Sequence, residues 1–336
     1  MVRSGLWIRG PVVDGFLALS WVPFALAAHA VEGDVTTLRT VVAAVMFLSF
    51  AHQPLTMPLV YGSPWRLQSH RRIFLWAPLV SLAVVTVFSH ISLGLLVVVG
   101  ALWNAEHTLM QRYGITRIYG RRAGDERGKI ERWMLVGWLL IPVLVVIARG
   151  QVLAMVDTLR VNMDATSATT LDRPSREARM TLVPVVAVTL VLTVRWLRAE
   201  FAGHTHANPA KRLYVASTAA MFIFGLFDPL AALVGFVGSH SVEYFAIVNQ
   251  SVATEARHPG PLGRVIRLRY GVSVFWTLCA VSIVGLFVLV YHVATPDQVI
   301  ESVLVLGSLH FFYDSFIWKL RKPEVAASLG SIRTLA

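Results

Sequence analysis

A succession of apolar segments, each about as long as a membrane is thick, constrains this chain more than any other feature. A helix needs about 20 mainly apolar residues to cross a hydrocarbon core. The hydrophobic residue set makes up 56% of the 336 residues and charged residues only 15%, with a mean hydropathy of +0.63. In soluble domains, by contrast, charged residues approach a quarter of the chain. The sequence therefore predicts an all-α, polytopic transmembrane helix bundle that forms one domain over residues 1–336 and contacts the lipid bilayer.

Ten windows qualify as spans. The stretch 213–252 is open to a second interpretation, because Asp228-Pro229 interrupts its apolar run and would either begin a new helix or kink a single one. A single kinked helix would move the C-terminus to the other side of the membrane. The predicted spans are residues 11–30, 41–62, 73–92, 94–113, 133–149, 180–197, 213–230, 231–252, 271–292 and 299–318.

The basic residues indicate the orientation of these spans. If the N-terminus is cytoplasmic, about 24 of the 30 lysines and arginines fall on the inner side, which is the positive-inside pattern. Both termini are then cytoplasmic, and we expect a multi-pass protein of a bacterial inner membrane. Topology explains the net charge of +11, so no nucleic-acid partner is expected. The predicted cytoplasmic loops are 63–72, 114–132, 198–212 and 253–270, and the long outer loop is 150–179.

Several kinds of site are excluded by composition. The single cysteine, Cys279, allows no intramolecular disulfide and no zinc or iron–sulfur site built on cysteines. No long hydrophilic stretch is present, so any chemistry is built within the helices or at their surface. Ala28-His29-Ala30 resembles a signal-peptide cleavage site, but Asp14 in the first apolar segment argues against a simple signal peptide.

Four histidines lie within the predicted spans at a similar depth. His52, His107, His240 and His310 belong to the second, fourth, eighth and tenth spans, which all run from outside to inside. At about 1.5 Å per residue, each lies roughly 8–20 Å from the cytoplasmic boundary. An ionisable group at the centre of a span costs about 2.5–3.5 kcal/mol, so such groups are usually paired, solvated in a cavity or functional. The shared depth predicts one functional site.

Polar neighbours one helical turn away strengthen this prediction. Residues three or four apart share a helix face, and a polar group there can bind the same metal or fix the tautomer of the histidine. Imidazole with carboxylate and no thiolate suits non-haem iron, and also zinc or copper. We therefore expect Fe(II), mononuclear or dinuclear, with zinc or copper as alternatives. The pairs are His107 with Gln111, His240 with Glu243 and Tyr244, and His310 with Asp314.

The candidate residues take different roles. Glu106 is the weakest acid, because it lies about 100° around the helix from His107 and could instead pair with a neighbouring helix. The same histidines could also form interhelical hydrogen bonds in a bundle without metal. The predicted metal ligands are His52, His107, His240, His310, Glu243 and Glu106, the predicted catalytic residues are Glu243, Tyr244 and Asp314, and Gln111 and Asp314 are predicted to orient the ligands.

The remaining polar and aromatic residues receive weaker assignments. Asp14 and Asp228 are expected to be structural or proton-linked. Aromatic side chains near the proposed site could line an apolar substrate channel or simply pack. They are Trp103, Phe311, Phe312, Tyr313 and Phe316.

The segments around the four histidines resemble those of the bacterial Brp/Blh-like membrane proteins. They are His52, His107, His240-Ser241 with Phe245 and Val248, and His310 with Phe316-Ile317-Trp318-Lys319. The resemblance implies a membrane-embedded iron held by histidines and the central cleavage of β-carotene to retinal. One departure is Tyr244, which stands where the family has a second histidine one turn after the first. Ten spans also exceed the smaller bundle of that family. The resemblance therefore implies a buried iron site more than it implies carotene as substrate.

Two functions of different classes follow. The first is a membrane-embedded non-haem iron oxygenase that acts with O2 on a lipophilic substrate such as a carotenoid, isoprenoid or fatty chain. The second is a proton- or metal-ion-coupled transporter that uses the same buried histidines and acids. A transporter would be expected to continue its polar residues toward both membrane faces, whereas this sequence gathers them in the inner half.

Overall fold

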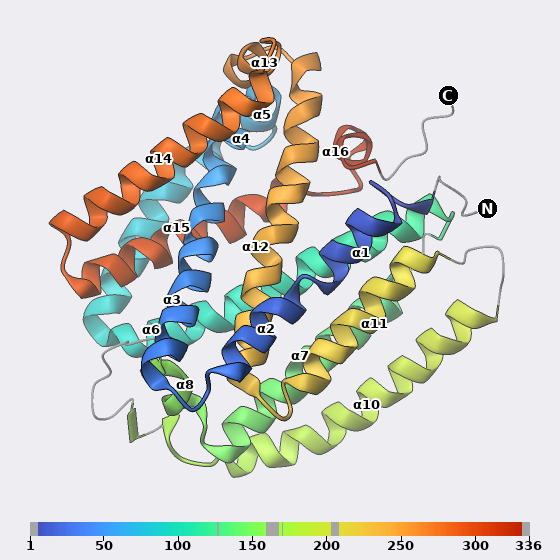
Figure 1. The fold of residues 1–336 in the computed structure, drawn as a ribbon, viewed down its shortest axis with the longest axis vertical. Coiled ribbons are helices and arrows are strands. Elements are labelled where there is room, and N and C mark those ends of the chain that lie inside the picture. Colours follow the sequence, from blue (N-terminus) through green and yellow to red (C-terminus); the bar gives the residue numbers. More distant parts are fainter. Residues whose placement is uncertain (1–5, 126–127, 159–167, 170, 203–207, 331–336) are drawn as a thin grey trace. The chain divides into compact units, whose positions relative to one another are not determined.

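The computed structural model describes residues 6–125, 128–158, 168–169, 171–202 and 208–330. All regular elements in these ranges are helices (Figure 1), so the all-α prediction is confirmed for the described chain. The elements are α1 (Pro11–Leu19), α2 (Trp21–Ala30), α3 (Val35–His52), η2 (Gln53–Leu55), α4 (Thr56–Tyr61), α5 (Pro64–Ser69), α6 (Arg71–Arg122), α7 (Lys129–Arg149), α8 (Val152–Thr158), α10 (Arg176–Phe201), α11 (Pro209–Phe224), α12 (Pro229–Thr254), η4 (Glu255–Arg257), α13 (Pro261–Ile266), α14 (Gly271–Val293), α15 (Pro296–Ile317) and α16 (Pro323–Ser328).

Eight helical segments of the described chain are long and apolar enough to cross a membrane. The chain is therefore a multi-pass membrane protein, whereas the count of ten spans stays a prediction. The difference has two sources. α6 contains two predicted spans within its 52 residues, and Ser92 between them has extended backbone, with φ −163° and ψ 105°. α11 ends at Phe224, within the predicted seventh span 213–230, and has only 16 residues, which is short for a crossing.

Two side-chain caps mark the points where neighbouring predicted spans separate. The Leu95 N–H donates to Ser92 Oγ at 3.3 Å, in the manner of a helix N-cap. The Ala231 N–H donates to Asp228 Oδ1 at 2.9 Å, and Pro229 between them is a favoured first residue of a helix. Asp228 therefore has a structural role as the cap of α12. The stretch 213–252 forms two helices rather than one kinked helix.

The chain folds into two compact units. Unit 1 comprises Met1–Met46, Ala105–Val242 and Gly330–Ala336, and unit 2 comprises Phe47–Asn104 and Glu243–Leu329. The prediction of a single domain over the whole chain stays a prediction. Each unit has its own buried core. The core of unit 1 includes Trp21, Leu109, Met134, Val215 and Phe236, and that of unit 2 includes Phe50, Leu59, Phe74, Val248 and Leu309.

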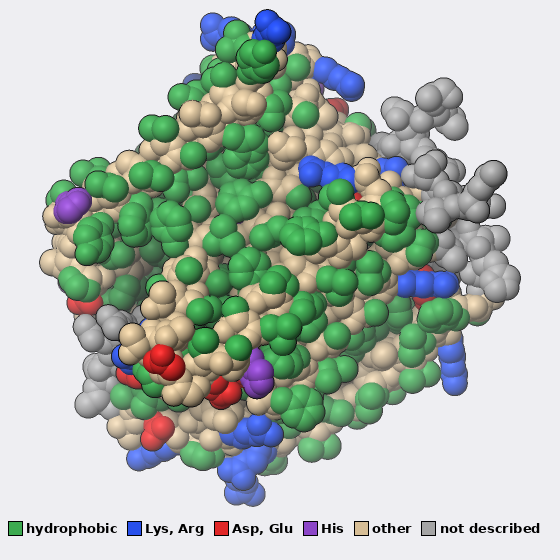
Figure 2. All heavy atoms as spheres, in the orientation of Figure 1, with side chains coloured by type: hydrophobic (Ala, Val, Ile, Leu, Met, Phe, Trp, Pro, Cys, Tyr) green, Lys and Arg blue, Asp and Glu red, His purple; other side chains and the backbone are tan. Residues whose placement is uncertain are grey.

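The helices differ in how much of their apolar surface is covered by protein. Only 11% of the most apolar window of α10 is buried, and 17% of that of α14, compared with 72% for the segment that contains α12. Figure 2 shows hydrophobic side chains over much of the visible face, and Val183 on α10 and Val281 on α14 are 71% and 65% exposed. Exposed apolar faces on this scale are suited to lipid contact. α12 is instead surrounded by protein.

A buried ion cluster joins four helix ends in unit 1. Lys211 at the start of α11 donates to Glu200 Oε2 at 2.7 Å and to Asp125 Oδ2 at 3.0 Å. Its Nζ also lies 3.2 Å from Glu131 Oε2. The three carboxylates come from the end of α10, the residues after α6 and the start of α7. These chain segments therefore meet at one end of unit 1, as expected for two loops on the same side of a membrane.

The opposite helix ends of unit 1 also meet one another. His29 Nδ1 at the end of α2 lies 2.8 Å from Asp228 Oδ2, just before α12. Arg39 near the start of α3 lies 3.2 Å from Asp157 of the predicted outer loop. The contacts agree with helices that cross in alternating directions. They do not decide which end is cytoplasmic, so the orientation of the termini stays a prediction.

We expect the ion cluster to be required for the stability of unit 1. Burial by itself lowers the pKa of Lys211, but Glu131, Glu200 and Asp125 raise it above its ordinary value. Lys211 is therefore charged at neutral pH, and its contribution is lost only as the pH rises through that raised pKa. Lys211→Met would leave buried carboxylates without their shared cation, which costs about 3–5 kcal/mol.

The measurement is the free energy of unfolding in detergent micelles. Arg132→Gln removes an exposed cation from α7 and serves as the control, with an expected change within about 0.5 kcal/mol. Equal stability of the two variants would contradict the role assigned to the cluster.

Candidate functional site

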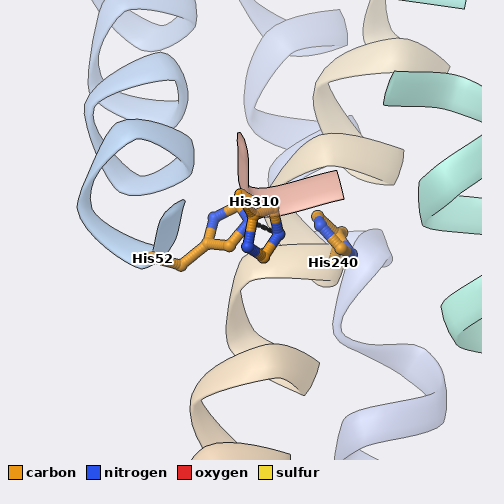
Figure 3. A group of neighbouring side chains, drawn as sticks. All are labelled: His52, His240 and His310. Atoms are coloured by element: carbon orange, nitrogen blue, oxygen red, sulfur yellow. Dashed lines mark hydrogen bonds between the residues drawn. The ribbon is translucent and has the colours of Figure 1, made fainter. Parts of the chain in front are cut away.

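Two histidine rings face each other inside unit 2. His52 is the last residue of α3 and His310 lies in α15, and both side chains are completely buried. Their Nε2 atoms are 3.2 Å apart, and the ring planes are inclined by 79°. Figure 3 shows this contact as a dashed line, and also draws His240 of α12. Two of the four predicted ligands therefore meet, although 258 positions separate them in the sequence.

The Thr56 hydroxyl connects the His310 ring to two further polar side chains. Thr56 Oγ1 lies 2.8 Å from His310 Nδ1 and 2.9 Å from the phenolic oxygen of Tyr244. Tyr244 donates to Asp314 Oδ1 at 3.0 Å, and Thr56 donates to the same oxygen at 3.3 Å. Asp314 Oδ2 itself is 3.7 Å from His310 Nε2. Asp314 thus reaches the ring mainly through Thr56, as a positioning residue would.

The local sequence explains why His52 and Thr56 both reach His310. α3 ends at His52 because Pro54 has no backbone N–H, and the chain continues through the short turn η2 before α4 begins at Thr56. Residues four apart on a helical path face the same side. Thr56 was not among the predicted site residues. Its spacing from His52 is the signal that could have found it, since the same spacing identified the partners of the other three histidines.

The His52–His310 pair has a geometry that suits a metal ion. A metal–imidazole bond is about 2.0–2.1 Å, so two nitrogens at about 90–109° around one ion lie about 2.9–3.4 Å apart. The observed separation of 3.2 Å falls in this range. If the Nδ1–H of His310 donates to Thr56, then its Nε2 presents a lone pair. A metal ion or a proton on His52 Nε2 would then occupy the space between the two nitrogens.

Two tyrosines fix the position of α15 in unit 2. The carbonyl of Phe74 in α6 has no helical donor, because Pro78 four residues later lacks an N–H. Tyr61 and Tyr313 both donate to this carbonyl, at 2.8 and 2.7 Å. Since Tyr313 is adjacent to Asp314, these bonds set the rotation of α15 against α4 and α6.

The other two predicted ligands form a ring pair in unit 1. The rings of His107 in α6 and His240 in α12 are perpendicular, with centroids 5.1 Å apart. Gln111 Nε2 donates to the backbone carbonyl of His240 at 3.1 Å. We predicted that Gln111 orients a ligand ring. The contact that the structure gives is with the backbone, so Gln111 positions α12 at the turn that contains His240.

The two remaining predicted acids differ in burial. Glu243 follows His240 on α12 and is 1% exposed. Glu106, predicted as a metal ligand or as a partner of a neighbouring helix, is exposed on α6. Within the described part of the chain, Glu106 belongs to no group of side chains with metal-binding spacing. The structure therefore places Glu243 in the protein interior and leaves Glu106 on the surface.

A buried ion pair in unit 2 was missed from the sequence. Arg66 donates to Glu255 Oε1 and to Ser251 Oγ, both at 2.8 Å, and Ser63 donates to Glu255 Oε2 at 2.6 Å. Burial lowers the pKa of the Arg66 guanidinium, and Glu255 partly opposes this. Glu255 is the single acid in the basic stretch 253–270, and this feature of the sequence could have predicted an ion pair there. The pair joins α5 to the end of α12.

Removal of the Thr56 hydroxyl tests whether Thr56 holds this hydrogen-bond network together. Thr56→Val keeps the shape of the side chain but leaves the buried Nδ1 of His310 without its threonine partner and removes one of the two hydrogen bonds to Asp314 Oδ1, which costs about 1–3 kcal/mol. Thr56→Ser keeps the hydroxyl and is the matched control. We expect denaturant unfolding in micelles to separate the two variants by about that amount. If valine and serine are tolerated equally, Thr56 does not organise the network.

Comparison of the chain with protein-family models, curated proteins and solved structures finds no match. The resemblance to the Brp/Blh-like proteins therefore remains a prediction from the segments around the four histidines. The site combines two apposed imidazoles with a threonine, a tyrosine and an aspartate in a buried network.

Proposed function

We propose that this protein is a membrane-embedded metalloenzyme, a non-haem iron oxygenase that acts on a lipophilic substrate. The observation that carries the proposal is the pair of buried imidazoles, His52 and His310, whose Nε2 atoms are 3.2 Å apart. Thr56, Tyr244 and Asp314 hold one of these rings in place. Metal-binding histidines characteristically have such partners on the far ring nitrogen.

α12 carries a further histidine that the sequence predicts as a ligand. His240 lies four residues before Tyr244 on one continuous helix, so the two side chains share a helix face. Tyr244 lies beside His310, with ring centroids 4.8 Å apart. His240 and His107, whose rings pack edge-on in unit 1, stay predicted ligands from the sequence, and the proposal rests on His52 and His310.

The donor set decides which metals are suitable. Neutral imidazoles with a nearby carboxylate and no thiolate suit iron, zinc or copper. Asp314, whose Oδ2 lies 3.7 Å from His310 Nε2, and Glu243, buried on α12, are the carboxylates that could offset the charge of the ion, and one or two ions are compatible with these residues. When bound, iron would supply the reactivity toward dioxygen. The protein contributes the ring orientation through Thr56 and a site from which bulk water is excluded.

An aromatic path in unit 2 favours an apolar substrate. Trp103 is 43% exposed, and its ring centroid lies 5.4 Å from that of Phe311, which is 7% exposed. Phe311 in turn lies 5.6 Å from the ring of His310. Apolar pocket walls with a few fixed polar groups are typical of sites for lipophilic ligands. We propose that a carotenoid, isoprenoid or fatty chain enters along these rings from the bilayer.

The proposed location follows from the charge distribution. The predicted orientation places both termini and the basic loops in the cytoplasm of a bacterium, with the histidines in the inner half of the membrane. The contacts of Arg66 and Lys211 support the grouping of the loops within each unit. Fusion of a cytoplasm-active reporter to each terminus would test this orientation.

Metal content tests the proposal most simply. Protein purified without chelators is expected to contain iron, and His52→Asn with His310→Asn is expected to remove most of it, because each ligand typically contributes tenfold or more to affinity. The matched control is His90→Asn with His292→Asn, which removes two exposed histidines. Bound metal that survives loss of His52 and His310 would exclude these residues as ligands.

A second assay separates the oxygenase from the transporter. The oxygenase is expected to consume O2 when supplied with an oxidisable lipophilic chain, and the His52/His310 variant is expected to lose this activity. A transporter would move protons or metal ions across proteoliposomes without consuming O2. Flux without O2 consumption, abolished by the same variant, would replace the oxygenase proposal with the transporter.

A further inference from the structure

Unit 2 carries a second set of polar side chains, which are basic and do not belong to the histidine network. It lies where α15 ends, α6 begins and the segment before α16 passes. The ring of Phe316 contacts two basic side chains there. Its centroid is 4.6 Å from Lys319 Nζ and 4.8 Å from the centroid of the His70 ring. Helix ends of this kind lie at the boundary between the hydrocarbon core and the headgroup region.

The cations of this surface have no acidic partners among the described residues. No ion pair joins Arg71, Lys319 or Lys322 to a carboxylate in the part of the chain that the structure describes. The pKa of His70 is lowered by burial and by Lys322 and Lys319, and that of Lys319 by burial and by Arg321 and Lys322. Burial is the larger cause of each shift, and the neighbouring positive charges add to it.

The ion cluster of unit 1 provides the contrast. There Lys211 is surrounded by Asp125, Glu131 and Glu200 and is fully paired. Basic residues at a membrane boundary can therefore be neutralised within this protein when they serve its fold. No such ion pair accompanies the lysines around Phe316 among the described residues.

The apolar surroundings indicate which anion fits. Directly after His70 and Arg71, the side chains of Ile73, Leu75 and Trp76 are 39%, 50% and 64% exposed. A free phosphate would use only the cations. A phospholipid would use both, because its phosphate meets the cations while its acyl chains lie along the exposed apolar side chains.

We propose that Lys319 and Lys322 form a binding site for the phosphate of an anionic phospholipid, with Phe316 as the floor of the site and the acyl chains of the lipid along the start of α6. The site is independent of the proposed oxygenase function. Its ligand is a structural or regulatory lipid of the annular layer rather than the substrate of the histidine site.

Lipid retention tests the site. The protein is reconstituted in nanodiscs of phosphatidylcholine with phosphatidylglycerol and then extracted in mild detergent. Native mass spectrometry identifies the lipids that stay bound. We expect phosphatidylglycerol to be retained in preference to phosphatidylcholine. Lys319→Gln with Lys322→Gln is expected to weaken retention about tenfold or more, because each basic residue near the surface contributes about 1 kcal/mol.

Two controls make the test specific. Arg264→Gln with Arg269→Gln removes two exposed cations from another part of unit 2, and we expect it to retain the lipid. Inorganic phosphate at millimolar concentration is expected not to displace it. Three results would each overturn the proposal: equal retention by the Lys319/Lys322 variant, equal loss in the arginine control, or displacement by phosphate. Unchanged thermal unfolding of both variants confirms that the comparison concerns binding.

Discussion

Inside the hydrocarbon core of a membrane no water is available to a polar side chain, so each such group must find its partners within the protein. In unit 2 one threonine supplies a partner to several of these polar groups. Thr56 lies within hydrogen-bonding distance of His310, Tyr244 and Asp314 at once. Because these residues come from three helices, their pairing fixes how α4, α12 and α15 pack. The position of the His310 ring, and hence its approach to His52, depends on that packing.

Backbone groups obey the same constraint. The Phe74 carbonyl, deprived of a helical donor by Pro78, is bound by Tyr61 and Tyr313. The break before α12 is satisfied in a comparable way, by the side chain of Asp228. At these two points, polar side chains hold irregular backbone in place.

Much of the architecture could be predicted from the sequence, because length, hydropathy and charge determine which segments can cross a bilayer. Each of the ten predicted spans is mostly helical, but Ser92 and the short α11 show why counting crossings is harder than finding helices. The meeting of His52 and His310 followed from their common depth. Thr56 and the Arg66–Glu255 pair were missed because a hydroxyl carries no hydropathy signal and a loop arginine looks like any other positive-inside charge. Glu106 was predicted as a ligand or as a partner of a neighbouring helix, and its exposure could not be predicted because helical angle gives the direction of a side chain but not what lies there.

The central claim is that the two buried imidazoles of unit 2 bind a metal ion. X-ray absorption at the iron edge of the purified protein tests it most directly, because the outer-shell scattering of imidazole rings identifies histidine ligands. The account predicts nitrogen neighbours at about 2.0–2.2 Å with the scattering of at least two imidazoles, reduced when His52 and His310 are replaced by asparagine. An absorption edge without imidazole scattering, or no metal in protein supplied with iron, would contradict it.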